Sequence, residues 1–173
     1  MKFFSANLQD LRELYNDSLQ KALDMEEQIT KALPAMIEKA TDPRLKEAFT
    51  THLRETDTHV AHVKEIVTQI YAEPKTSKCK VLSSLVSEAE DAMADATDPS
   101  VRDAALIAAA QQVEHHEMAV YGTLRNWADL LGETAQAQTL NHILEQEKNA
   151  DSILTDISDR VNQDADNRTS RAA

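Results

Sequence analysis

Two glutamates in the second half of the chain stand where the helical pattern calls for apolar residues. Glu114 and Glu117 lie on a stripe, spaced alternately by three and four residues, that also contains Ile107, Tyr121 and Leu124. This spacing defines the buried face of a helix. Because an unpaired buried carboxylate is costly, two of them one turn apart require compensating positive charge. A pair of metal ions is the candidate source of that charge.

Polar residues interrupt three further apolar stripes in the same way. Glu26 stands on the first stripe, Glu55 and His59 stand on or beside the second, and Glu147 and Asp151 stand on the last. Taken singly, each acid is more often a boundary residue whose carboxylate reaches water. A shared site therefore depends on whether the four interruptions can meet.

The elements that carry these residues are expected to be helices throughout. The chain has only two glycines and four prolines, and aromatic residues make up 4% of it, which is the composition of long helices. The sequence predicts an all-α fold with almost no strand. Cap residues and apolar periodicity place the helices from Ser5 or Asn7 to Lys39, from Pro43 to Ile70, from Val81 to Ala94, from Pro99 to Leu131, and from Thr134 to Val161.

The four long helices form two predicted hairpins, and their register brings the polar positions to one level. The first hairpin turns near Asp42, with Glu26 16 residues before it and Glu55 13 residues after it. The second turns at a glycine, with Glu117 and Glu147 each 15 residues away. At about 1.5 Å rise per residue, these heights agree to about one turn. Antiparallel pairing of the hairpins then gathers the polar residues into one buried cluster.

The cluster predicts a dinuclear metal site. Carboxylate oxygens with one or two imidazoles suit two iron ions, with manganese as the alternative, better than zinc in a thiolate site. His52 is expected to support the site, whereas His115 and His116 lie off the face of the helix that Glu114 shares. The predicted ligands are Glu26, Glu55, His59, Glu114, Glu117, Glu147 and Asp151.

Charge and composition limit the partners and the compartment. The formal net charge of -12 disfavours binding to nucleic acid or to an anionic membrane surface. A single cysteine, Cys79, suits a reducing compartment, and no signal segment or membrane span is recognisable, so a cytoplasmic location is expected. Residues 1–162 are predicted to form one domain, and the polar residues 163–173 a disordered tail.

Five runs of the sequence resemble the YciE/YciF stress-protein family. They are EEQITKALP at residues 26–34, HLRET at 52–56, VRDAALIAAAQ at 101–111, VEHHEMAVYGT at 113–123 and EQEKNAD at 145–151. The resemblance covers nearly the whole chain except its last dozen residues. It implies a ferritin-like four-helix bundle related to rubrerythrin, with a short fifth helix in the long crossover between the hairpins. It also implies a homodimer.

The same resemblance assigns roles to individual residues. Glu26 and Glu55 take the ligand places of the first half, Glu114 and Glu117 match the paired glutamates of rubrerythrin-type sites, and Glu147 begins the last motif. This chain departs from the superfamily pattern at two places. Asp151 stands where a histidine is usual, and His59 follows Glu55 by four residues where three is more common. The resemblance therefore implies a carboxylate-rich site whose reactivity can differ from that of a ferroxidase.

Two functions are open at this point. The first is a non-haem dinuclear metal protein, most simply diiron, that acts in a stress response by reacting with oxygen or peroxide on an unidentified substrate. Whether it is an enzyme is left open, as is the identity of a redox or protein partner. The alternative is a stress-induced helical interaction protein whose metal site is structural or vestigial.

Overall fold

The computed structural model describes residues 8–172, with side chains placed up to residue 167. Five α-helices and no strand occur in this part of the chain. The helices are α1 Leu11–Lys39, α2 Pro43–Tyr71, α3 Lys80–Asp95, α4 Pro99–Leu130 and α5 Thr134–Ala172. The predicted all-α fold and its element order are confirmed.

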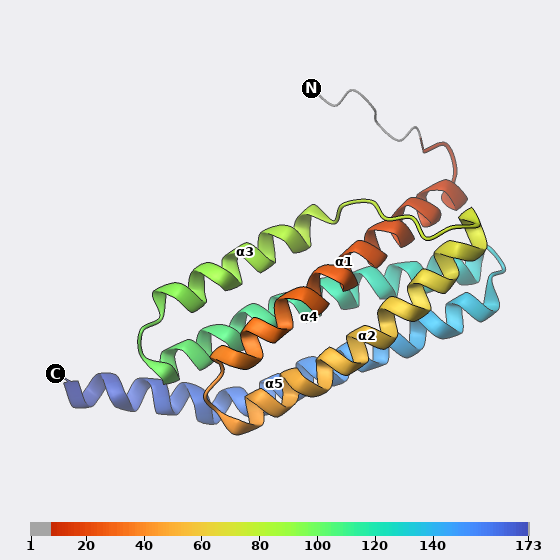
Figure 1. The fold of residues 1–173 in the computed structure, drawn as a ribbon. Coiled ribbons are helices and arrows are strands. Elements are labelled where there is room, and N and C mark those ends of the chain that lie inside the picture. Colours follow the sequence, from red (N-terminus) through yellow and green to blue (C-terminus); the bar gives the residue numbers. More distant parts are fainter. Residues whose placement is uncertain (1–7, 173) are drawn as a thin grey trace.

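The four long helices pair as two hairpins, and the shorter α3 lies outside them. Helix α1 packs on α2, and α4 packs on α5, while α1 also meets α4 and α2 meets α5. Helix α3 lies against α4 and α1, on the side of the bundle away from α2 and α5 (Figure 1). The chain thus crosses from one hairpin to the other through α3, as the four-helix bundle with a fifth helix requires.

Aspartate caps and one glycine set the ends of the helices that carry the site. Asp42 accepts hydrogen bonds from the backbone N–H groups of Arg44 and Leu45, and Asp98 caps α4 in the same way. A proline follows each of these aspartates at the start of its helix. Gly132 follows α4 with a φ of 78°, a left-handed conformation that glycine adopts without strain. Both predicted turns are confirmed.

Two helix predictions require correction. Helix α1 begins at Leu11, where Asp10 accepts a bond from the Glu13 N–H, and the predicted caps Ser5 and Asn7 lie outside the described residues. Helix α5 continues past Val161 to Ala172, so the disordered tail expected at 163–173 is wrong for residues 163–172. No glycine or proline follows residue 132 to stop the helix.

Two helices contain an internal residue that usually weakens a helix. Pro34 lies within α1, which is helical on both sides of it, although the proline ring removes one backbone hydrogen bond. Gly122 lies within α4. A Cβ built there would meet no atom within 4 Å, so close packing does not require glycine at this position.

The core consists of the facing apolar stripes of the helices. Tyr15 and Tyr121 are the largest of its fully buried side chains, and leucines and isoleucines fill most of the rest. Of the described helices, none has the length and apolar character needed to cross a membrane. Polar side chains interrupt this core at its middle, where all four long helices contribute.

Candidate metal centre

Six acidic and histidine side chains from four helices meet inside the bundle. In one group, Glu26 of α1, His59 of α2 and Glu147 of α5 offer one ligand atom each, and these atoms lie within 4.8 Å of one another. The members of this group are all fully buried. A spacing within this limit allows the three atoms to bind a single ion.

A second group shares one of those residues. His52 of α2, Glu114 and Glu117 of α4, and Glu147 of α5 place ligand atoms within the same 4.8 Å limit, and all four side chains are buried. Because Glu147 belongs to both groups, its two carboxylate oxygens can serve two adjacent positions. The arrangement therefore has the layout of a dinuclear site with one shared carboxylate.

The polar atoms of this cluster lack the partners that buried polar groups normally have. Nine of its carboxylate oxygens and ring nitrogens find no hydrogen-bond partner in the described part of the chain. Most buried polar atoms in folded proteins are hydrogen-bonded, because leaving them unpaired costs free energy. The unpaired atoms belong to Glu26, His52, His59, Glu114, Glu117 and Glu147, the six residues of the two groups.

The surroundings of His59 show how its ring is oriented. Its Nε2 lies 3.1 Å from Oε1 of Gln146, which can only accept, so Nε2 carries the proton in the neutral ring. The other nitrogen, Nδ1, then faces Oε1 of Glu147 at 3.0 Å and Oε2 of Glu26 at 3.6 Å with its lone pair. Lone pairs that face one another in this way require a proton or a cation between them.

A proton is the only partner that the residues themselves supply. Burial lowers the pKa of His59, but the adjacent carboxylates of Glu147 and Glu26 outweigh burial and raise it to about 10. Without a metal ion, the ring is therefore protonated at neutral pH and forms an ion pair with these carboxylates. A metal ion would replace that proton and bind the neutral ring.

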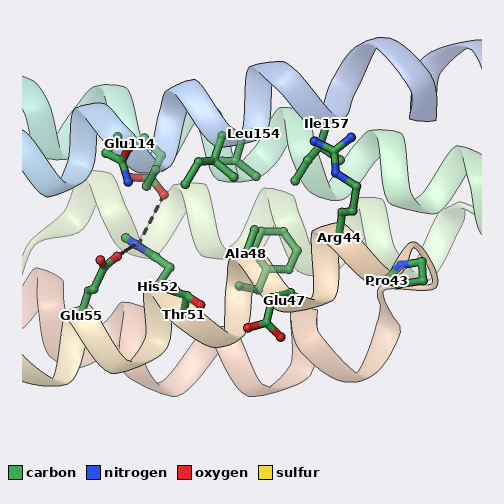
Figure 2. A pocket seen from close by; sticks show the side chains of 14 residues that line it. Pro43, Arg44, Glu47, Ala48, Thr51, His52, Glu55, Glu114, Leu154 and Ile157 are labelled. Carbon is green, nitrogen blue, oxygen red and sulfur yellow. Dashed lines mark ion pairs between the residues drawn. The ribbon is translucent and has the colours of Figure 1, made fainter.

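His52 occupies the second group rather than a supporting position. Its Nε2 lies 3.4 Å from Oε1 of Glu114, and its Nδ1 lies 4.0 Å from a carboxylate oxygen of Glu55 (Figure 2). The same Nδ1 lies 4.0 Å from Oε2 of Glu147. Burial, with a contribution from His59, lowers the pKa of His52 to about 4. The ring is thus neutral at physiological pH, which is the state that binds metals.

Burial also shifts the carboxyl groups of the cluster. It raises the pKa of Glu114 and of Glu117 well above the usual range, and the negative charge of Glu147 adds to both shifts. Burial likewise raises the pKa of Glu147, although the nearby His59 opposes the shift. Carboxyl groups in such surroundings hold protons unless a cation compensates their charge.

Tyr121 extends the cluster on its α1 side. Its hydroxyl donates a hydrogen bond to Oε1 of Glu26, and both side chains are fully buried. Burial, together with the charge of Glu26, raises the pKa of the phenol well above its usual value. The tyrosine remains neutral and holds the Glu26 carboxylate in position.

Two of the seven predicted ligands lie outside the two groups. The side chain of Glu55 is 28% exposed, and its Oε2 lies 4.0 Å from Nδ1 of His52. Asp151 is 21% exposed and lies 3.3 Å from Nε2 of His115, while the side-chain amide of Gln111 donates to it. The structure brings the other five predicted residues together and adds His52, which sequence reasoning had assigned a supporting role.

The histidines next to Glu114 point away from the cluster. His115 is largely exposed, and His116 is half-buried with its Nε2 3.6 Å from the sulfur of Cys79. Their placement agrees with the helical angles read from the sequence. His52 lies on the same helical stripe as Thr56 and His59, so its spacing already indicated that it faces the core. Spacing alone could not show whether His52 is a ligand or only supports one.

The donor set fits two divalent ions. Four glutamates and two histidines equal the number of each ligand type in ferritin-like dimetal sites, although here α2 supplies both histidines. Four carboxylates carry about four negative charges, which two divalent ions would cancel. Hard oxygen donors with imidazole suit iron or manganese.

A protein family and a known protein match this chain over most of its length. The model of the Domain of unknown function DUF892 matches residues 10–166. Protein YciF of Escherichia coli strain K12 is 35% identical over 164 residues, which cover 94% of this chain and 99% of YciF. The predicted resemblance to the YciE/YciF family is confirmed.

Solved structures of similar proteins share the fold. The E. coli stress protein YciF superimposes with a TM-score of 0.85 at 34% identity, over 90% of this chain and 99% of that one. YcfI of Rhodopseudomonas palustris gives 0.84 at 37% identity, over 88% and 98% of the two chains. A Xanthomonas campestris protein gives 0.76 at 25% identity, over 93% and 99%. The ferritin-like bundle is thus confirmed.

Proposed function

We propose that this chain, which belongs to the DUF892 family, is a dinuclear non-haem metal protein that reacts with oxygen or peroxide in a stress response. Two iron ions are the proposed cofactors, with manganese as the alternative. The stress assignment is supported by the similarity to E. coli YciF, which is described as a stress protein. We further propose that the protein is cytoplasmic and acts as a homodimer.

The unpaired polar atoms at the centre of the bundle carry this proposal. Nine such atoms converge from four helices, and Glu147 belongs to both groups of ligand atoms. A structural role for buried acids would normally provide them with hydrogen-bond donors. Their lack of donors favours cations as their partners.

The chain's residues would bind the ions and control access to them. Glu26, His59 and Glu147 would hold one ion, while His52, Glu114 and Glu117 would hold the other together with Glu147. Bound iron would supply one-electron chemistry toward oxygen or peroxide, which side chains alone lack. The apolar layers above and below the cluster limit the access of water along the axis of the bundle.

The test is metal binding by the purified full chain and by one variant. We expect about two Fe(II) per chain on anaerobic addition, and oxygen consumption when air is admitted. Glu147→Gln should reduce both by at least tenfold, since the shared ligand loses its charge. Glu145→Gln is the matched control, because Glu145 lies on the exposed face of α5. Less than a tenth of an equivalent of iron in the unmodified protein would reject the proposal.

A structural role is the second candidate. YcfI, one of the similar proteins, has been suggested to be structural, and the metal site of this chain could then be a structural clip between helices or a vestige. Metal-free protein separates the two functions. If Glu147→Gln removes the metal yet leaves stress protection and partner binding unchanged in cells, the structural role is favoured.

A further inference from the structure

A cavity of about 430 Å³ lies between α2 and α5 beside the candidate metal centre. Its volume is within the range of cavities that bind small organic molecules. His52, Glu55 and Glu114 line one end of it, and two of these residues belong to the second group of ligand atoms. A molecule in this cavity would therefore meet the proposed metal centre directly.

The middle of the cavity is apolar, and Arg44 lies at its far end. Glu47 also lines the cavity. Phe49, Leu154 and Ile157 contribute to its walls. Figure 2 shows Ala48 and Leu154 between the His52 end and the Arg44 end. These walls suit an apolar chain, and the two polar ends would fix its direction.

Arg44 is available to an anionic ligand. Its guanidinium forms no ion pair with any side chain that the structure places, and in Figure 2 it reaches from α2 toward Ile157 on α5. The neighbouring charges are already engaged, because Glu47 lies 3.9 Å from Arg54 and Arg160 pairs with Asp42. An arginine is well suited to bind a carboxylate with two hydrogen bonds.

The spacing of the two ends sets the length of the ligand. Arg44 and His52 are eight residues apart on one helix, which corresponds to roughly 12 Å. An extended chain advances roughly 1.2 Å per bond. We propose that the cavity binds an unbranched carboxylate of about ten carbons, with its carboxylate at Arg44 and its far end at His52 and Glu114. This proposal rests on the proposed dinuclear function, because the end of the ligand at His52 and Glu114 would lie beside the metal ions.

Calorimetric titration of the metal-loaded full chain tests the recognition of the carboxylate. Sodium decanoate is expected to bind about tenfold more tightly than 1-decanol, the uncharged molecule of equal length. Arg44→Gln should abolish this difference, whereas Lys64→Gln, which removes an exposed positive charge on the same helix away from the cavity, should keep it within about twofold. Equal binding of decanoate and 1-decanol, or tighter binding of decylammonium, would overturn the proposal.

The direction of the ligand is measured with manganese as a paramagnetic probe. In Mn(II)-loaded protein, the terminal methyl protons of decanoate should relax faster than the methylene protons next to its carboxylate, with Zn(II)-loaded protein as the diamagnetic reference. Faster relaxation of that methylene would mean that the carboxylate binds the metal, which contradicts the proposal. Metal content is determined in the same samples. Full metal loading without decanoate binding rejects only the ligand, whereas Arg44-dependent binding without metal uptake rejects only the dinuclear function.

Discussion

Two clusters of buried acidic side chains in this bundle differ in what surrounds them. At the turn between α1 and α2, Asp103 accepts hydrogen bonds from the backbone N–H groups of Thr41 and Asp42 and from the Thr41 hydroxyl. Asp42 caps α2 and pairs with Arg160. In the centre of the bundle, by contrast, the glutamates face one another and two histidines, with most of their oxygens unpaired.

Burial alone does not identify the acids that could bind a metal. Asp103 is only 3% exposed, as is Glu114, so the two acids cannot be distinguished by burial. They differ in their donors, because helix ends present free N–H groups whereas the middle of a helix has none to offer. Acids at a helix end can be satisfied by the protein itself, and acids on four facing helix centres require a proton or a cation.

The largest effect is expected in the free energy of unfolding when one acid of each cluster is replaced and the two variants are compared. Asp103→Ala leaves three donors without their acceptor and should lower the free energy of unfolding by about 3 kcal/mol, with or without metal. Glu117→Gln replaces a carboxyl group that must take up a proton on folding with a neutral amide, and should raise the stability of metal-free protein at neutral pH by about 1 kcal/mol. Urea denaturation of both variants measures these changes. A destabilised metal-free Glu117→Gln protein would mean that the central acids have protein partners.

An effect of intermediate size is expected in the pH dependence of stability. The stability of metal-free protein should change with pH in a different way from that of metal-loaded protein. Glu114 and Glu117 have raised pKa values in the fold, so they bind protons more tightly folded than unfolded. Their contribution to stability is full below the unfolded pKa and is lost as pH rises through the folded pKa. Metal-free protein should therefore lose several degrees of melting temperature between pH 6 and pH 9.

Metal loading reverses this dependence. Because the ion displaces protons from these carboxyl groups and from His59, binding should release at least about one proton per chain at pH 7 and tighten as pH rises. Calorimetry in buffers of different ionisation enthalpy counts the protons. Binding without proton release would contradict the protonated state inferred for the metal-free cluster.

The smallest effects are expected from the two predicted ligands that lie outside the groups. Glu55→Gln and Asp151→Asn should each change iron affinity by less than about fivefold, since both carboxylates are partly exposed and lie at the edge of the site. Iron titration of these two variants and of Glu147→Gln measures the three affinities for comparison. A loss as large as that of Glu147→Gln would show that the excluded residue turns inward when metal binds.

The sequence predicted the fold and most of the cluster because both depend on regular helical geometry. The stripe through Glu114 and Glu117 and the caps at Asp42 and Asp98 identified buried faces and helix starts directly. Counting residues from each turn then brought Glu147 to the level of Glu117. These inferences need only the rise and the angle per residue.

The sequence did not determine which neighbouring side chain turns inward. Glu55 and His52 are one turn apart on α2, and the choice between them depends on the rotation of that helix against α4 and α5. Asp151 follows Glu147 by one turn, yet contacts with His115 and Gln111 hold it at the edge. The end of α5 was misplaced because polar composition alone does not stop a helix that lacks glycine and proline.

Anomalous diffraction from crystals of iron-loaded protein tests the central claim most directly. Data collected on both sides of the iron absorption edge should give two peaks per chain. One is expected among Glu26, His59 and Glu147, and the other among His52, Glu114 and Glu117, with Glu147 between them. The absence of iron peaks at these positions, or peaks only beside the hydrogen-bonded acids Asp42 and Asp103, would contradict the account.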